Sequence, residues 1–314
     1  MSGPVNEVNA APGATFALGR QPVLAGALGA LVIAFSAILV KLAEVSPATS
    51  AFFRCAYAVP VLGLLAWIER RRYGPRPMRE RAPILGAGVL FAADLIFWHY
   101  SIQAVGAGLA TVLGNIQVVL VALLAWAFLG ERPTNRTLAA IPVVFAGVVL
   151  ISGVIGAAAY GDDPVLGVVY GVSTAIAYAL FILILRHANA DLRRPAGPLF
   201  DATLVAAICC GLAGAAIGDI DWVPDAEAQA WLALLALSSQ VLGWMLISVS
   251  LPRLPAALGS ILLTLQPVCT VILGVILLSE QPSAVQLSGV AIVLAGVAFA
   301  TLQPTSRRRP VSTS

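Results

Sequence analysis

Long apolar runs dominate the chain, and short polar stretches separate them. A run of about 20 apolar residues is long enough to cross a bilayer as an α-helix. Ten such runs lie near residues 23–43, 49–69, 83–103, 106–128, 137–157, 165–185, 199–217, 228–250, 255–278 and 284–303. The third and fourth runs are separated by only a few residues, which predicts a tight antiparallel hairpin. The pattern therefore predicts an all-α integral membrane protein with ten transmembrane helices.

The composition supports a membrane location and excludes several kinds of site. Of the 314 residues, 60% are hydrophobic and 11% are charged, and the mean hydropathy is +0.94. A soluble domain carries about 25% charged residues, so we expect the lipid bilayer to surround this chain. The four cysteines lie in apolar runs without metal-ligand spacing, which favours neither a disulfide framework nor a metal site. No cofactor is expected. The cysteines are Cys55, Cys209, Cys210 and Cys269.

The basic residues indicate how the chain is oriented. If the N-terminus is cytoplasmic, 16 of the 18 basic residues fall on the cytoplasmic side, and only Lys41 and Arg54 lie toward the other side. The positive-inside rule then predicts a multi-pass protein of the bacterial inner (plasma) membrane with both termini in the cytoplasm. Nucleic-acid binding is the other common reason for clustered arginines. Because topology already accounts for them, no nucleic-acid partner is expected.

The chain contains an internal repeat. Shifted by 149 residues, 109–153 align without gaps on 258–302, and 13 of these 45 positions are identical. The identical pairs include Gln117 with Gln266 and Glu131 with Glu280, which apolar composition alone does not explain. Five spans per copy place the second copy upside down, an architecture that many secondary transporters use. We therefore expect two inverted five-helix repeats around a central cavity.

The predicted domains follow from this repeat. The first repeat covers 23–157 and the second covers 165–303. Residues 1–22 lack the features of a signal peptide and are expected to form a disordered cytoplasmic tail. Residues 304–314 are expected to form a basic cytoplasmic tail.

Asp94 is a charged residue inside an apolar run. It lies about 17 Å from the cytoplasmic end of the third span, close to the bilayer midplane. A carboxylate there costs about 2.5–3.5 kcal/mol on insertion scales, so a compensating partner is required. One interpretation pairs it with Arg54, at a similar depth in the second span. The other makes it a ligand for a cation, an amino group or a coupling proton. Both interpretations hold if the pair of Asp94 and Arg54 opens during transport.

An amide and two tryptophans reach a similar depth. Gln240 lies near the midplane in the eighth span, the inverted counterpart of the third. Trp98 and Trp244 follow Asp94 and Gln240 by four residues, which puts each pair on one helix face. We expect the two pairs to line opposite sides of the cavity. The alternative is that the tryptophans pack against lipid or anchor at the interface.

More amides are predicted near the midplane. Gln117 and Gln266 are related by the repeat, and Asn115 precedes the first of them. Pro267 follows the second, which predicts a kink in the ninth span. Buried amides beside a broken helix can bind polar groups of a substrate. Interhelical hydrogen bonding explains them equally well.

Two more side chains complete the predicted substrate site. His99 can titrate near physiological pH or form a simple hydrogen bond at the interface. Tyr178, in the sixth span, can line the cavity or pack between spans. The full set of predicted substrate-binding residues is Asp94, Trp98, His99, Asn115, Gln117, Tyr178, Gln240, Trp244 and Gln266.

Several motifs resemble a known transporter family. LGERPT at 129–134, its echo LSEQPS at 278–283, and the AGVVLI and AGVAFA that follow resemble the EamA repeat of the drug/metabolite transporter superfamily. FWHYS at 97–101 and NIQVVLVALLAW at 115–126 are similar to the YddG-type amino-acid exporters. The second copy departs from the pattern, with Gln281 where the first has Arg132. The resemblance implies a ten-helix carrier with a central cavity, and export as the direction.

We therefore expect a secondary carrier that exports small organic metabolites, most of all amino acids, by alternating access. A proton-coupled multidrug efflux carrier is the first alternative. A membrane-embedded transferase is the second, although the loops are short for binding a charged headgroup. The chain has no Walker A lysine, H-E-x-x-H or G-x-S-x-G, so a non-enzyme is predicted. A small-molecule substrate and the bilayer are the expected partners, and the chain can be a monomer or a homodimer.

Overall fold

The computed structural model describes residues 21–155, 159–188, 191, 193–250, 253–254 and 256–301, and its regular elements are helices. In order they are α1 (Pro22–Ala34), α2 (Ser36–Leu42), α3 (Pro47–Tyr73), α4 (Met78–Val105), α5 (Ala107–Gly114), α6 (Gln117–Leu129), α7 (Asn135–Ile151), α8 (Pro164–Ala188), α9 (Ala196–Ile217), α10 (Ala226–Leu235), a π-helical segment (Ala236–Gly243), α11 (Trp244–Ser250), α12 (Ala256–Leu277) and α13 (Ala284–Thr301). The predicted C-terminal tail and nearly all of the predicted N-terminal tail lie outside the described residues.

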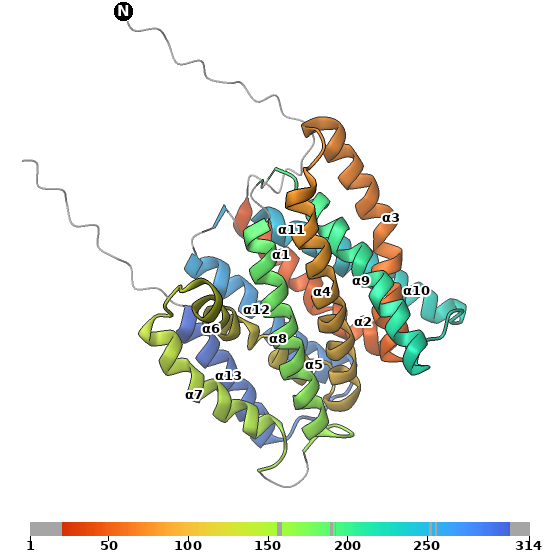
Figure 1. Ribbon diagram of the computed structural model, residues 1–314. Helices are drawn as coiled ribbons and strands as arrows, with labels where there is room; N and C mark the ends of the chain where they lie inside the picture. The colour runs from red at the N-terminus through yellow and green to blue at the C-terminus, as the bar shows by residue number, and fades with distance from the viewer. Residues whose placement is uncertain are drawn as a thin grey trace, which may run out of the picture.

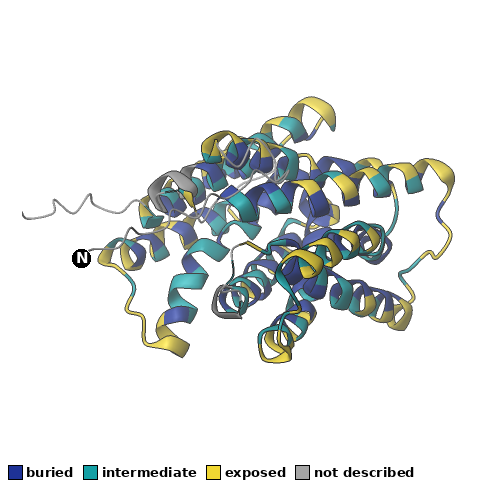
Figure 2. Cartoon of the chain, turned by 90° about the horizontal axis from the view of Figure 1, so that it is seen from above, coloured by how far each residue is buried: buried dark blue, intermediate teal, exposed yellow. Residues whose placement is uncertain are grey.

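These helices account for the ten predicted spans (Figure 1). Three spans are built from consecutive pieces: α1 with α2, α5 with α6, and α10 with the π-helical segment and α11. Within the described residues, eight helical stretches are long and apolar enough to cross a membrane, and two shorter apolar helices accompany them. The shorter ones are 135–151 and 262–277. Seen from above, buried residues face the interior of the bundle and exposed residues cover its outside (Figure 2).

Local sequence signals fix where several spans begin and end. Ser46 and Thr134 cap α3 and α7, because each hydroxyl accepts a hydrogen bond from the backbone N–H three residues later. Asp225 caps α10 in the same way. Gly106 has a φ of 88° and forms the whole connection between α4 and α5. This left-handed conformation suits glycine, and it produces the predicted hairpin.

The connections between the spans gather at two ends of the bundle, an arginine-rich end and an acidic end. The arginine-rich end holds the connections 74–77, 130–134 and the segment before α9. The acidic end holds 43–46, Gly106, the segment before α8, 218–225 and 278–283. Successive spans alternate between these ends.

The repeat of the sequence is also a repeat of structure. α3 and α9 begin at Pro47 and Ala196, 149 residues apart, and α7 and α13 begin at Asn135 and Ala284, with the same spacing. α5 and α12 also begin 149 residues apart. The helix starts therefore keep the register that the sequence alignment predicted.

α7 and α13 pack against each other through equivalent contacts. A Cβ added to Gly147 would lie 2.8 Å from Cγ2 of Val293, and one added to Gly296 would lie 2.8 Å from Cγ2 of Val144. The repeat exchanges these two contacts, because Gly147 corresponds to Gly296 and Val144 to Val293. The helices run antiparallel, since Gln286 near the start of α13 donates to the carbonyl of Ile151 at the end of α7.

α3 and α9 form a second antiparallel pair, with a carboxylate at each end. At the arginine-rich end, Glu69 accepts hydrogen bonds from the backbone N–H groups of Ala196 and Gly197, at 2.9 and 2.8 Å. At the acidic end, Asp219 accepts one from the N–H of Ala48 at 3.3 Å. Each helix N-terminus therefore has an acidic partner, as its positive dipole end favours. Equivalent helices run antiparallel, which confirms the inverted repeat.

Candidate substrate site

Arg54 lies at the centre of the bundle, in α3, and only 4% of its surface is exposed. Its Nε donates to Oε1 of Gln240 at 3.1 Å, and its Nη2 donates to the hydroxyl of Ser239 at 3.4 Å. Its Nη1 is buried and has no hydrogen-bond partner. A buried, incompletely paired guanidinium is costly, so this atom marks a place where an anionic group would be strongly stabilised.

The partners of Arg54 come from an unusual helical segment. Ser239 and Gln240 lie in the π-helical segment, and both are completely buried. Short π-helical insertions occur often at functional sites because they disturb the regular backbone pattern. Gln240 also donates from Nε2 to the hydroxyl of Thr203 at 3.1 Å. The amide is therefore held on both sides, and it fixes the position of the Arg54 side chain.

Trp98 and Asp94 lie one helical turn apart on the face of α4 that is turned toward Arg54. Asp94 is 7% exposed. Among the described residues, however, the hydrogen bonds of Arg54 go to Gln240 and Ser239 rather than to Asp94. The direct pair considered from the sequence is therefore not formed. The Arg54 guanidinium lies over the Trp98 ring, 5.4 Å from its centroid, which is cation–π geometry.

His99 is buried next to this centre. It is 1% exposed, and its Nδ1 lies 2.5 Å from the carbonyl oxygen of Leu95. The other ring nitrogen, Nε2, is buried without a hydrogen-bond partner. His99 is therefore surrounded by protein.

Aromatic rings from two helices, α4 and α8, surround Trp244. Its ring lies 6.0 Å from that of Tyr178, 5.9 Å from that of Phe91 and 6.3 Å from that of Phe181, each in edge-to-face geometry. Phe91 and Phe181 stack at 4.7 Å. Phe91 precedes Asp94 by three residues in α4, about one helical turn. This aromatic cluster therefore adjoins the charged centre and offers an apolar surface next to it.

Asn115, Gln117 and Gln266 are the amide residues predicted in the fourth and ninth spans. Asn115 lies between the end of α5 and the start of α6, and its Oδ1 is buried without a hydrogen-bond partner. Gln117 and Gln266 are half-buried, and the hydrogen bonds of the described residues do not join their side chains to Arg54. α12 continues as one helix through Pro267. Of these two spans, the fourth is therefore the one that is divided into two helices, beside Asn115.

Glu280 closes the acidic end of the bundle between the repeats. It is 2% exposed, and its carboxylate accepts hydrogen bonds from the N–H groups of Ala107 at 2.5 Å and Gly108 at 3.1 Å. Gly274 makes room, since a Cβ there would lie 2.4 Å from a Glu280 oxygen. A carboxylate from the second repeat thus caps the first helical piece of the fourth span.

Sequence reasoning did not assign Arg54 to the substrate site. It considered this residue only as a structural partner of Asp94. Two features of the sequence could have indicated more. Arg54 is one of only two basic residues outside the expected cytoplasmic segments, and charged residues inside a membrane are costly and often functional.

The comparisons with known proteins agree with this architecture. The model of the EamA-like transporter family matches residues 20–153 and again residues 165–302. One solved structure, described only as the crystal structure of a protein, is 18% identical and has a TM-score of 0.60. That match covers 90% of this chain and 96% of the other, and at this identity the likeness concerns the fold. No curated protein sequence matches the chain.

Proposed function

Because the chain belongs to the EamA-like transporter family, we propose that it is a secondary carrier that exports amino acids by alternating access. Membrane transport is the role of the family. The substrate class is supported by one observation above all: the buried Nη1 of Arg54 has no hydrogen-bond partner, and the buried Asp94 lies one helical turn from Trp98, whose ring packs against the same guanidinium. The export direction is supported by the resemblance of the motifs.

A zwitterion matches this arrangement of charges. The α-carboxylate would accept a hydrogen bond from Nη1 of Arg54, and the ammonium group would lie against Asp94. Charge-assisted bonds of this kind are about twice as strong as neutral ones. Trp244 and its aromatic neighbours would contact the side chain of the substrate. Both charges of the protein would then be paired only when a substrate with both charges is bound.

The inverted repeat supports alternating access. The centre joins the repeats, because Arg54 comes from the first and Gln240 from the second. The Glu280 contact joins them again at the acidic end. Two equivalent halves can exchange their conformations and so open the centre to either side.

Asp94→Asn tests the proposal. The variant keeps the shape of the side chain and removes its charge. We expect it to lose most flux of zwitterionic amino acids in proteoliposomes, while it still inserts and remains monodisperse. Arg79→Gln, an exposed change at the arginine-rich end, is the control and should transport normally. Unchanged flux in the Asp94 variant would remove this residue from the site.

We also propose that the arginine-rich end faces the cytoplasm of a bacterial inner membrane. The positive-inside rule supports this orientation. Single cysteines at position 79 or 162, introduced into a cysteine-free variant, report it directly. A membrane-impermeant maleimide added outside intact cells should label the Asp162→Cys variant and leave the Arg79→Cys variant unlabelled. The reverse pattern would invert the assignment.

A second candidate function is proton-coupled efflux of hydrophobic compounds. It is favoured by two buried titratable side chains, Asp94 and His99, on one helix beside the aromatic cluster. An imposed pH gradient separates the two proposals. Efflux of a hydrophobic cation driven by that gradient, without any amino-acid flux, would favour the second.

A further inference from the structure

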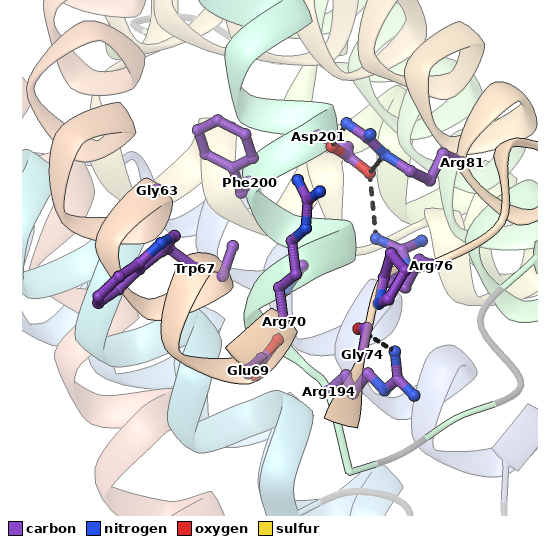
Figure 3. Close-up of a pocket in the computed structure, with 13 residues that line it drawn as sticks. Gly63, Trp67, Glu69, Arg70, Gly74, Arg76, Arg81, Arg194, Phe200 and Asp201 are labelled. Carbon is purple, nitrogen blue, oxygen red and sulfur yellow. Dashed lines mark hydrogen bonds and ion pairs between the residues drawn. The ribbon is translucent and has the colours of Figure 1, made fainter. Parts of the chain in front are cut away.

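A pocket of about 340 Å³ opens at the arginine-rich end, away from Arg54 (Figure 3). It lies between the end of α3, the connection 74–77, and the start of α9. Four arginines and two carboxylates line it, so its ionisable side chains are positive overall. They are Arg70, Arg76, Arg81, Arg194, Glu69 and Asp201.

Both carboxylates of the pocket are already engaged. Asp201 is 2% exposed and accepts hydrogen bonds from Arg76 at 3.0 Å and from Arg81 at 2.8 and 3.1 Å. Glu69 accepts its two bonds from the backbone at the start of α9. These contacts hold three elements together around the pocket, and they leave neither acid to neutralise Arg70.

Arginine donors remain available in the pocket. Arg70 is exposed, and Figure 3 shows its side chain reaching between Phe200 and Asp201. One nitrogen of Arg76, Nη2, is buried without a hydrogen-bond partner. Burial also lowers the pKa of Arg76, because it removes water from around the guanidinium. An anion bound nearby would offset this cost.

The wall of the pocket continues onto an apolar surface. Leu64, Trp67 and Ile68, in the last turns of α3, are 56, 51 and 48% exposed. The guanidinium of Arg71 lies over the Trp67 ring, 4.9 Å from its centroid. An exposed tryptophan beside arginines at the end of a transmembrane helix is typical of the membrane interface. Acyl chains can cover the apolar residues while a headgroup reaches the arginines.

We propose that this pocket binds an anionic phosphate group, and that an anionic phospholipid is the molecule that carries it. Basic pockets between helices at this depth suit phospholipid headgroups. Arg70 contacts the phosphate directly, and Arg76 and Arg81, fixed by Asp201, supply the surrounding positive charge. The apolar surface of α3 binds the lipid tail, which a soluble phosphate compound lacks.

The test measures binding to the full-length, delipidated protein in detergent. Native mass spectrometry follows titrations with phosphatidylglycerol and with phosphatidylcholine, and inorganic phosphate is added as a competitor. Arg70→Gln should weaken phosphatidylglycerol binding by about fivefold, which corresponds to about 1 kcal/mol. Arg79→Gln removes the same charge from the same end outside the pocket, and it should change binding by less than twofold.

Each outcome decides the proposal. A loss of phosphatidylglycerol binding specific to Arg70→Gln, with phosphatidylcholine unaffected, supports the lipid. Phosphate binding that depends on Arg70, without preference between the lipids, supports the phosphate site but assigns it to a soluble compound. Equal losses of phosphatidylglycerol binding in both arginine variants would overturn the proposal. Absence of binding of both phosphatidylglycerol and phosphate would also overturn it. Neither variant touches the central site, so the result is independent of the transported substrate.

Discussion

Arg54 donates a hydrogen bond from Nε to Oε1 of Gln240 at 3.1 Å, and this bond joins the two repeats at their buried centre. Ser239 holds a second nitrogen of the same guanidinium. The third nitrogen, Nη1, is buried without a hydrogen-bond partner. In the proposed function, the carboxylate of the substrate would pair with this nitrogen.

Arg54→Lys tests the importance of the guanidinium shape. Lysine keeps the charge but loses the fixed fork of donors that can bind Gln240 and a carboxylate together. We expect the apparent KM for amino acids to rise by roughly tenfold in proteoliposome uptake, with a smaller change in maximal rate. Arg71→Lys, at the exposed end of the same helix, is the control. An unchanged KM would show that only charge matters at position 54.

Trp244→Ala tests where the side chain of the substrate lies. The aromatic cluster would lose its largest apolar surface, so large apolar amino acids should lose affinity more than small ones. We expect the preference for leucine over alanine to fall by about tenfold in competition assays. Trp126→Ala, which removes a tryptophan that is 48% exposed, is the control. An equal loss for both substrates would place the side chain elsewhere.

Glu280→Gln tests the contact that closes the acidic end. The charge of the carboxylate strengthens both bonds to the start of α5 and complements the helix dipole. We expect the neutral amide to destabilise the protein by about 1–3 kcal/mol, seen as a lower unfolding temperature in detergent. Glu227→Gln changes an exposed glutamate at the same end and should have little effect. Equal unfolding temperatures in the two variants would contradict the assigned role.

Gly147→Ala tests the close packing of α7 and α13. The added Cβ would lie 2.8 Å from the backbone oxygen of Gly289, too close for a normal contact. We expect a loss of about 1–3 kcal/mol in stability. Gly86→Ala is the matched control, because a Cβ there meets no atom within 4 Å. Thermal unfolding of the purified variants compares them, and similar unfolding temperatures would argue against a tight contact at Gly147.

The sequence predicted the spans and the repeat because both depend on the order of residues alone. The apolar runs gave the number of crossings, and the 149-residue register gave the equivalent helices. It did not predict the interruptions at Phe35 and in the segment 236–243. Spans that are apolar on every side carry no periodic signal to show a change in backbone hydrogen bonding. Contacts such as that of Thr270 with the carbonyl of Ala34 form only in the folded bundle.

The candidate site could be predicted in part. Depth along each helix placed Asp94 and Gln240 at one level, but depth does not give the rotation of a helix about its axis. That rotation decides which residue Arg54 contacts, and the structure selects Gln240 rather than Asp94. The caps formed by Glu69 and Glu280 also could not be predicted from the sequence, because their partners are backbone N–H groups of helices that are distant along the chain.

The spans differ in length from one flank of the bundle to the other. α3 has 27 residues and α4 has 28, about 40 Å each, whereas α7 has 17, about 26 Å. The hydrocarbon core of a bilayer is about 30 Å thick. Hydrophobic mismatch should therefore thin the membrane locally at α7, where Phe145 is 68% exposed. Stability measured in bilayers of different acyl-chain length should be highest in the thinner ones, and a maximum in thick bilayers would refute this. The protein would then sort toward thin regions of its membrane, so bilayer thickness becomes a physical variable that influences where it resides.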